Sequence, residues 1–231
     1  MQLNLFSGGA AQAVITGVQP EFQRDHACEL TPTFGAVGAM RDKLLAGEPC
    51  DLVVLSAALV EQLEAGGQVL AGSARSLGSV ATGIAVRAGD APVPVASVAE
   101  LKASLSAARG LYVPDLKKST AGIHIAGMLA ALGLEQVLAG RIHEFPNGAT
   151  AMQAMADSPE KGLVGCTQVT EIMYTPGVSL VGELPAGHAL STVYTAAVCS
   201  AARQPALAGA LVALLAGESS AELRRSCGFG A

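Results

Sequence analysis

The sequence opens with a short apolar run that enters a glycine-containing turn and passes directly into a helical repeat. Leu3–Phe6 has the composition of a buried strand, Ser7-Gly8-Gly9-Ala10 form the turn, and Gln12–Arg24 carries apolar side chains at helical spacing. The first backbone N–H groups of a helix have no internal acceptor, so such a junction can hold an anion. The turn contains neither G-x-G-x-x-G nor G-K-[ST], which excludes dinucleotide and P-loop fingerprints. A plain turn without a ligand is the alternative interpretation.

The same alternation of strand and helix continues along the whole chain. The expected strands are Leu3–Phe6, Glu29–Phe34, Cys50–Leu55, Val80–Val86, Gly110–Val113, Arg141–Phe145, Gly162–Cys166, Val178–Glu183 and Leu190–Cys199. The expected helices are Gln12–Arg24, Ala36–Leu45, Leu59–Glu64, Val98–Ala107, Thr120–Leu132, Ala149–Ala156, Gln168–Met173, Pro205–Ala216 and Ser220–Ser226. Ser97 and Glu100 have the spacing of a capping box. The pattern predicts an α/β protein.

About ten strands are too many for one small sheet, so two lobes are expected. Each lobe should hold a mainly parallel sheet flanked by helices. The strands Val80–Val86 and Leu190–Cys199 are the candidates for two hinge crossings. This partition predicts lobe I over residues 1–80 and 194–231 and lobe II over residues 81–193. A ligand cleft is expected between the lobes, at the carboxyl ends of the strands.

Composition excludes several classes of protein. The net charge of -5 and the absence of Trp disfavour a nucleic-acid partner, and no apolar run reaches the length of a membrane span. No secretory signal precedes the first strand, so we expect a cytoplasmic protein, or a periplasmic one if a signal peptide has been removed. The five cysteines have no C-x-x-C spacing, so we expect them to be buried reduced thiols. We expect no bound metal and no cofactor.

Several segments together resemble a known family. They are LNLFSGGAAQAV, TFGAVGAMRDKLLAGEPCDLVVLSA, YVPDLKKSTAGIHIAGMLAALGL, KGLVGCTQVTEIMYTPGVSLVGELP and RRSCGF. The chain resembles type II periplasmic solute-binding proteins, and within them the molybdate-binding family of ABC importers. The resemblance implies two α/β lobes, a hinge and an anion held between helix N-termini, with an ABC importer as a possible partner if the protein is exported.

The resemblance also implies where a ligand would bind. The candidate ligand-binding residues are Ser7, Gly8, Gly9, Ala10, Val37, Gly38, Lys117, Ser119, Thr120, Ala121, Asn147, Thr167 and Gln168. At least three hydroxyl groups of the family's oxyanion cage are missing: Ala10 stands near a serine column, the turn 35–38 has no hydroxyl, and Gly165 stands where a tyrosine is frequent. We therefore expect an enlarged, less polar cavity and a larger anion, a small carboxylate rather than molybdate.

Several candidate residues also have a purely structural interpretation. Lys117, with its neighbour Lys118, is equally well explained as a solvated loop lysine, and Asn147 as a helix N-cap. His124 is either a general acid or base or a half-exposed structural histidine. Glu171 is expected to be a surface carboxylate, and Asp51 is expected to have a structural or capping role.

Two functions of different classes follow. The first is a solute-binding protein that closes on a small anion. The second is a cytosolic isomerase of unsaturated di- or tricarboxylates, since some proteins that resemble this family isomerise aconitate by moving a proton across an allylic system. That reaction needs an acid or base, for which His124 is the candidate, and a carboxylate clamp, here Gly8–Ala10 and Lys117–Ala121, but no cofactor. A cytosolic ligand sensor is a third, weaker alternative.

Overall fold

The computed structural model describes residues 1–230, which form two compact units. Unit 1 comprises Met1–Ser79 and Thr192–Ala231, and unit 2 comprises Val80–Ser191. The chain therefore passes between the units twice, once within each of the two strands expected to cross. The expected lobes, 1–80 with 194–231 and 81–193, differ from these units by one or two residues at each boundary.

The sheet of unit 1 is built around its first strand. Strand β1 (Gln2–Gly8) lies between β2 (Glu29–Gly35) and β3 (Leu52–Ser56) and is parallel to both. Strand β9 (Ser191–Val198) pairs with β3 in the antiparallel direction. Gly8 is opposite Gly35, so β1 and β2 end level with each other at one edge of the sheet.

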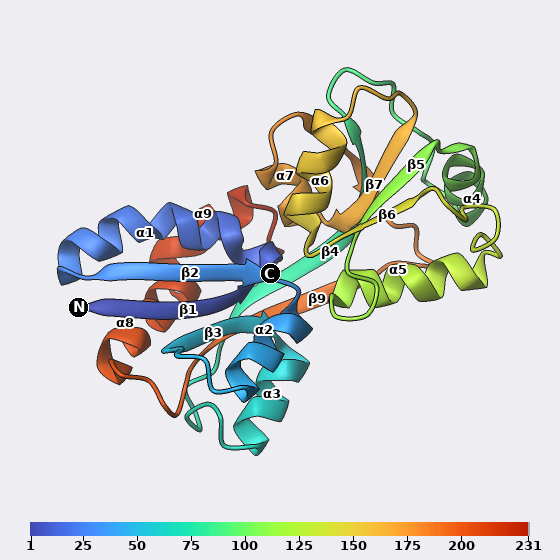
Figure 1. The fold of residues 1–231 in the computed structure, drawn as a ribbon. Helices are drawn as coiled ribbons and strands as arrows, with labels where there is room; N and C mark the ends of the chain where they lie inside the picture. Colours follow the sequence, from blue (N-terminus) through green and yellow to red (C-terminus); the bar gives the residue numbers. More distant parts are fainter. Residues whose placement is uncertain (231) are drawn as a thin grey trace. The chain divides into compact units, whose positions relative to one another are not determined.

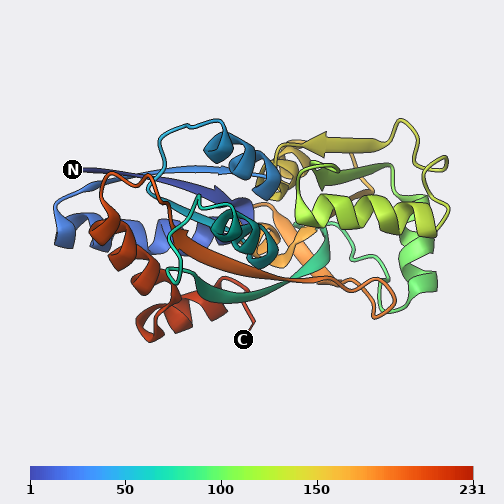
Figure 2. The same ribbon diagram turned by 90° about the horizontal axis from the view of Figure 1, so that it is seen from below.

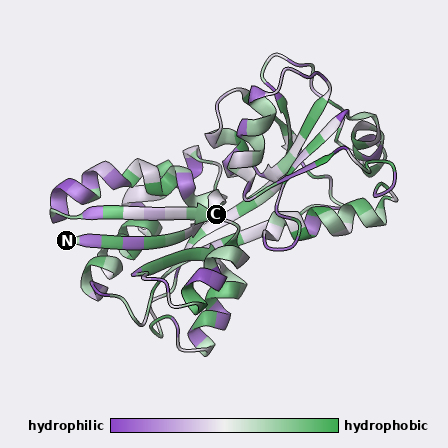
Figure 3. Cartoon of the chain, in the orientation of Figure 1, coloured by the Kyte–Doolittle hydropathy of each residue, from purple (hydrophilic) through white to green (hydrophobic). Residues whose placement is uncertain are grey.

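Helices cover the unit 1 sheet in two groups. A 3₁₀ turn (Gly9–Ala11) leads into α1 (Gln12–His26), which contacts α8 (Pro205–Ala216) and α9 (Ala221–Ser226). Helices α2 (Val37–Leu45) and α3 (Ala57–Ala65) contact each other and lie on the other face (Figures 1 and 2). Strand β3 is buried along its whole length, which explains its continuous apolar sequence (Figure 3).

The sheet of unit 2 has the order β4-β7-β5-β6. Its strands are β4 (Arg75–Arg87, beginning in unit 1), β5 (Gly110–Pro114), β6 (Ile142–Phe145) and β7 (Leu163–Gln168), and β8 (Val178–Glu183) also pairs with β4. Strand β5 is parallel to β6 and β7, whereas β4 is antiparallel to β7 and β8. The helices are α4 (Val98–Ala107), α5 (Thr120–Ala131), α6 (Gly148–Asp157) and α7 (Val169–Tyr174).

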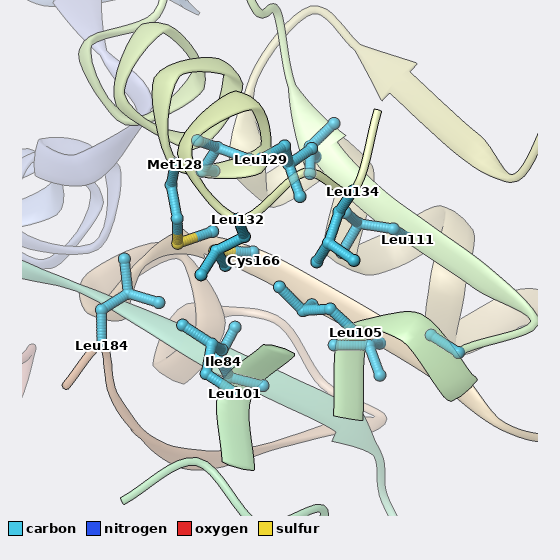
Figure 4. Packing of buried hydrophobic residues seen from close by; sticks show 14 of the residues in the cluster. Ile84, Leu101, Leu105, Leu111, Met128, Leu129, Leu132, Leu134, Cys166 and Leu184 are labelled. Atoms are coloured by element: carbon cyan, nitrogen blue, oxygen red, sulfur yellow. The ribbon is translucent and has the colours of Figure 1, made fainter. Parts of the chain in front are cut away.

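The core of unit 2 has two parts. Helices α4 and α5 supply Leu101, Leu105, Met128 and Leu129 to a buried cluster that also includes Ile84 of β4 (Figure 4). A second cluster is formed by α6 with β5 and β7 and contains Tyr112, Ala151, Met152, Met155, Leu163 and Ile172. Burial on both faces holds the carboxyl ends of β5 and β7 in place, and these ends lead into α5 and α7.

The predicted α/β fold is confirmed, and so is the capping box, in which Ser97 accepts from the Glu100 N–H and Glu100 accepts from the Ser97 N–H. Several predicted bounds are wrong. Gln168 is the last residue of β7 rather than the start of a helix, α3 begins at Ala57 rather than Leu59, and the strand expected from Val80 begins at Arg75. The reason for the first two is that strand-to-helix turns here have no intervening loop, so periodicity alone misplaces the boundary.

Within residues 1–230 no single helix has both the length and the apolar character to cross a membrane, although α8 and the segment Glu218–Ser226, bent by 53° at their junction, pass that test as a pair.

A buried carboxylate joins three segments of unit 1. Asp51 is 1% exposed, and its Oδ2 atom accepts a hydrogen bond from the N–H of Asn4 on β1 at 2.8 Å. Its Oδ1 atom accepts from the N–H groups of Arg203 at 2.7 Å and Gln204 at 3.2 Å, just before α8. Because this buried carboxylate joins backbone groups of three separate segments, the expected structural role of Asp51 is confirmed.

Asp51→Ala should lower the free energy of unfolding by about 3 kcal/mol, because it leaves backbone N–H groups of β1 and of the α8 start without their charged acceptor. Urea unfolding followed by circular dichroism measures the change. Asp25→Ala is the matched control, since Asp25 forms only an exposed ion pair with Arg24 and should change stability by less than about 0.5 kcal/mol. Equal effects of the two substitutions would contradict the structural role of Asp51.

Candidate functional site

The three strand-to-helix junctions of unit 1 share one property. The residues before the 3₁₀ turn, α2 and α3 are Gly8, Ala36 and Ser56, and none of these provides a side-chain cap. The first backbone N–H groups of α2 and α3 therefore have no intrahelical acceptor and no capping side chain. Since β1, β2 and β3 are parallel and in register, these junctions lie at the same edge of the sheet. Unit 1 thus presents backbone donors, with partial positive charge, at its carboxyl edge.

The turn after β1 exposes backbone rather than side chains, because neighbouring side chains pack closely against Gly8. A Cβ atom added to Gly8 would lie 2.7 Å from Cγ1 of Val37 and 3.0 Å from Cε1 of Tyr194, so only glycine fits. Ser7 is fully buried, and its hydroxyl donates to the carbonyl oxygen of Gly8 at 2.8 Å. Ala10 is also buried. Of the residues predicted to bind ligand here, Ser7 and Val37 support the turn with their side chains, and the donors on offer are backbone N–H groups.

In unit 2 the loop before α5 is held by its own acidic residue. The Oδ1 atom of Asp115 accepts from the N–H groups of Lys117 and Lys118, both at 2.8 Å. Ser119 caps α5 by accepting from the N–H of Gly122 at 3.3 Å. A Cβ atom on Gly122 would lie 2.0 Å from the carbonyl oxygen of Asp115, which requires glycine there. The loop is therefore built by internal hydrogen bonds.

Two backbone N–H groups at the start of α5 are not used by the hydrogen bonds of this loop. In the part of the chain that the structure describes, the N–H groups of Thr120 and Ala121 have no hydrogen-bond acceptor. The side chain of Lys117 is exposed, in agreement with the solvated interpretation. Of the predicted unit 2 residues near α5, Ser119 has a capping role, and Thr120 and Ala121 keep their backbone donors available.

Glu171 is buried, although the sequence predicts that it lies on the surface. It is only 4% exposed, so the expectation of a surface carboxylate is wrong. Its Oε2 atom accepts from the hydroxyl of Thr167 at 2.6 Å, and its Oε1 atom accepts from the N–H of Gly148 at 3.0 Å. A Cβ atom on Gly148 would lie within 2.1 Å of this carboxylate. Glu171 thus acts as an internal hydrogen-bond acceptor at the N-terminus of α6.

The electrostatics of Glu171 combine two opposing effects. Burial disfavours the charged form and is the larger effect, so the pKa of the Glu171 carboxyl is raised above its ordinary value. Hydrogen bonds from Thr167 and from the N–H groups of Gly148, Ala149 and Gln168 favour the charged form and oppose the rise. The only early sign of this site is the spacing of Thr167 and Glu171, four residues apart across the β7–α7 junction.

Three further predicted ligand residues have internal partners. The hydroxyl of buried Thr167 is bonded to Glu171. The side-chain amide of buried Gln168 lies 3.1 Å from the carbonyl oxygen of Val80 and 3.3 Å from that of Ala81, and it satisfies both when its nitrogen is turned toward them. Asn147 accepts from the N–H of Thr150 at 2.8 Å, so it is the N-cap of α6. These contacts account for the three side chains, and ligand contact by any of them stays a prediction.

His124 lies in the first turns of α5, half-buried. Its Nε2 atom is 2.7 Å from the carbonyl oxygen of His188, which requires a proton on Nε2. In the neutral ring the lone pair is then on Nδ1, which can accept a proton. The structural role is established by this contact, and a role as general base stays a prediction.

The expected enlargement of the cavity at Gly165 is wrong. A Cβ atom on Gly165 would lie 2.5 Å from Cε and 2.7 Å from Sδ of Met152. The side chain of Met152, from α6, therefore fills the space next to this glycine, which sequence reasoning could not anticipate because Met152 and Gly165 are on different elements. The absent hydroxyl lowers polarity without creating room for a ligand.

A cavity of about 750 Å³ in unit 2 lies away from these junctions. Val86, Pro94, Ala103, Ala107 and Leu163 form much of its apolar wall, and its charged residues are Asp90, Glu100 and Lys161. A mainly apolar wall with two acidic residues and one basic residue does not favour an anion. Across residues 1–230, no group of three or more His, Cys, Asp or Glu side chains is placed to hold a metal ion.

Glu171→Ala should destabilise the protein by about 2–4 kcal/mol, because it leaves the Gly148 N–H buried without an acceptor. Glu171→Gln keeps an acceptor for Gly148 and gives Thr167 a donor, so it should cost less. Because the folded-state pKa is raised, the contribution of Glu171 to stability is full below the ordinary glutamate pKa and falls as pH rises through the raised value.

Urea unfolding of the wild type and Glu171→Gln across pH 4–8 measures this dependence. The difference in unfolding free energy between the two proteins should shift in favour of the Gln variant as pH rises. A difference that is constant with pH would show that the carboxyl titrates alike in the folded and unfolded chain.

Comparison with known proteins gives the family. The family model of bacterial extracellular solute-binding proteins matches residues 3–230. Aconitate isomerase from a Pseudomonas species is 26% identical over 233 residues, which cover 98% of this chain and 87% of that protein.

Solved structures give the fold. The periplasmic molybdate-binding protein of Azotobacter vinelandii has a TM-score of 0.82 at 16% identity and 99% coverage of both chains. The sulfate-binding protein SubI of Mycobacterium tuberculosis H37Rv has a TM-score of 0.76 at 17% identity, covering 99% of this chain and 86% of SubI. Because the family model covers nearly the whole sequence, this chain belongs to the bacterial extracellular solute-binding protein family.

Proposed function

We propose that this chain binds a small di- or tricarboxylate anion through backbone N–H groups at the starts of its helices. In unit 1 the donors are those of Gly9, Ala10, Val37 and Gly38. In unit 2 they are those of Thr120 and Ala121, and Lys117 supplies positive charge. The observation that carries the proposal is the set of helix starts in unit 1 without a capping side chain.

The chemistry of these donors favours a carboxylate. A tetrahedral oxyanion such as molybdate or sulfate is a small sphere and needs donors converging on it from several directions, including side-chain hydroxyls that can reorient. The turn 35–38 carries no hydroxyl, and that of Ser7 is bonded to Gly8. A carboxylate group presents two oxygens in a plane and is well matched to adjacent N–H groups at a helix start.

The relatives support the same choice. The structural neighbours named for molybdate and sulfate are 16% and 17% identical to this chain, a level at which a likeness shows only the fold. The relative with 26% identity over nearly the whole sequence is named for aconitate, which is a tricarboxylate. As a receptor, the chain would deliver such an anion to an ABC importer outside the cytoplasm.

A thermal-shift screen tests the ligand class. Citrate, aconitate, malate and succinate should be compared with molybdate, tungstate and sulfate at equal ionic strength. A carboxylate present at 100 times its Kd should stabilise the protein by about 2.7 kcal/mol, and the oxyanions should have little effect. Strong stabilisation by molybdate with none by the carboxylates would overturn the proposal.

A pair of variants at one position then tests the backbone donor. Thr120 is the first residue of α5, where proline is tolerated, and Ser119 before it is extended with ψ of 137°. Thr120→Pro removes the N–H and should weaken carboxylate binding about tenfold, whereas Thr120→Ala keeps the N–H and should change Kd by less than about threefold. Val98→Pro at the start of α4 is the matched control and should leave Kd unchanged.

A second function is supported by the relative named aconitate isomerase. In that function a base removes a proton from the CH₂ group next to a carboxylate, and the proton returns at the other end of the allylic system. Nδ1 of His124 carries the lone pair of the neutral ring and is the candidate base, with the ring oriented by the carbonyl oxygen of His188. Nothing in this proton shift requires a redox cofactor.

The isomerase function predicts a change in ultraviolet absorbance when the purified protein is mixed with trans-aconitate. His124→Asn should lower kcat by a factor of about 10²–10⁴ while the Kd for a saturated tricarboxylate stays the same. His26→Asn, on the exposed end of α1, is the control. Carboxylate binding without turnover would reject the isomerase function and leave the receptor function in place.

A further inference from the structure

The cavity of unit 2 lies at one edge of its sheet, away from the proposed carboxylate donors. Its walls come from Val86 near the end of β4, from the loop 89–94, from α4 and from residues 161–164 at the start of β7. Because β4 and β7 are antiparallel, the end of β4 and the start of β7 lie at the same edge. Helix α5 follows the carboxyl end of β5, which is parallel to β7, so Thr120 and Ala121 belong to the opposite edge. The cavity is therefore separate from these anion donors.

Helix α4 supplies one wall of the cavity with small side chains. Leu101 and Leu105 point into the core of unit 2 (Figure 4), whereas Ala103 and Ala107 are exposed and line the cavity. Since these two positions carry only a methyl group, the space beside the helix stays open. The other segments add valine, leucine and proline side chains, and among residues 1–230 no aromatic side chain lines the cavity. The wall is therefore mainly aliphatic.

Hydrogen bonds between the wall segments keep the cavity open. The hydroxyl of Ser104 on α4 donates to the carbonyl oxygen of Pro94 in the loop at 2.6 Å. The N–H of Arg109, just after α4, donates to the carbonyl oxygen of Gly162 before β7 at 2.9 Å. Because α4 is bonded to both of these segments and its other face is packed in the core, the cavity is preformed. Its volume of about 750 Å³ is in the range of sites for small organic ligands.

The charged groups of the wall already have partners or water. Asp90 pairs with Arg87 at 3.1 Å, and these side chains are only 23% and 16% exposed. Glu100 accepts from the N–H of Ser97 at 3.2 Å in the capping box of α4. Lys161 is exposed, so water solvates its ammonium group. An ionic ligand would therefore lose its hydration in the cavity without gaining a counter-ion, whereas an uncharged ligand has no such cost.

We propose that this cavity binds an uncharged, mainly aliphatic molecule. The proposal does not depend on the anion site, and both can be tested on the same protein. Affinity comes from burial of the ligand's apolar surface against the aliphatic wall, so it increases with the length of the ligand. Each additional CH₂ group should lower Kd by about two- to fourfold until the cavity is filled.

Displacement of N-phenyl-1-naphthylamine, an uncharged probe that fluoresces strongly outside water, tests the proposal on the intact protein. 1-Hexanol, 1-octanol and 1-decanol should displace the probe with increasing affinity. Octanoate and octylammonium should each bind at least about fivefold more weakly than 1-octanol, because each must lose the hydration of its charge. Tighter binding of either ion, or no displacement by the alcohols, would overturn the proposal. Saturating citrate should leave the probe bound, and displacement by citrate would contradict a site separate from the anion donors.

Variants locate the site on α4. The double variant Ala103→Leu, Ala107→Leu fills part of the cavity and should weaken 1-octanol binding by about tenfold, while leucine at exposed helix positions preserves the helix. Ala130→Leu, at an exposed position of α5 outside the cavity, is the control and should leave binding unchanged. Unchanged binding in the double variant, with its circular dichroism spectrum intact, would show that the site is elsewhere. If the double variant fails to fold, the displacement series on the wild type still decides the proposal.

Discussion

Backbone N–H groups at the starts of helices are the constraint on which this structure depends. Each strand that turns directly into a helix brings such groups to the carboxyl edge of a sheet, and each group needs an acceptor. In unit 2 the acceptors are mostly internal: Ser97, Ser119 and Asn147 cap three helices, and the Glu171 carboxylate serves the start of α6. In unit 1 the corresponding positions carry no capping side chain. In the proposed function, unit 1 is therefore the main source of donors for an anion.

Buried carboxylates have the same physical role in both units. Asp51 accepts from backbone N–H groups of β1 and of the turn before α8, and Glu171 accepts from Gly148 and from the Thr167 hydroxyl. Each is a carboxyl group of the chain itself that accepts hydrogen bonds where backbone donors converge. Removal of either would leave those donors without their acceptor, and both side chains are buried, so both residues belong to the framework rather than to a ligand-exchange surface.

The two proposed functions, receptor and isomerase, share one first step, the proposed binding of an anion by backbone groups. The family is defined by solute binding, and a relative that covers nearly the whole sequence is named for isomerisation of aconitate. What separates the two functions is a group that exchanges a proton with the ligand. His124, whose Nε2 atom lies 2.7 Å from the carbonyl oxygen of His188, is the residue proposed for that step.

Local sequence was sufficient for the order and type of the elements. The 3.6-residue period of Gln12–Arg24, the apolar run around Val53 and the Ser97–Glu100 spacing each depend on neighbours a few residues away, so the sequence by itself determined the α/β alternation and the helix caps. Tertiary structure alone decided that Glu171 is buried, that Met152 fills the space beside Gly165, and that Asp51 joins β1 to the turn before α8. Each of these depends on contact between separate elements, and periodicity carries no information about which distant side chains a fold brings together.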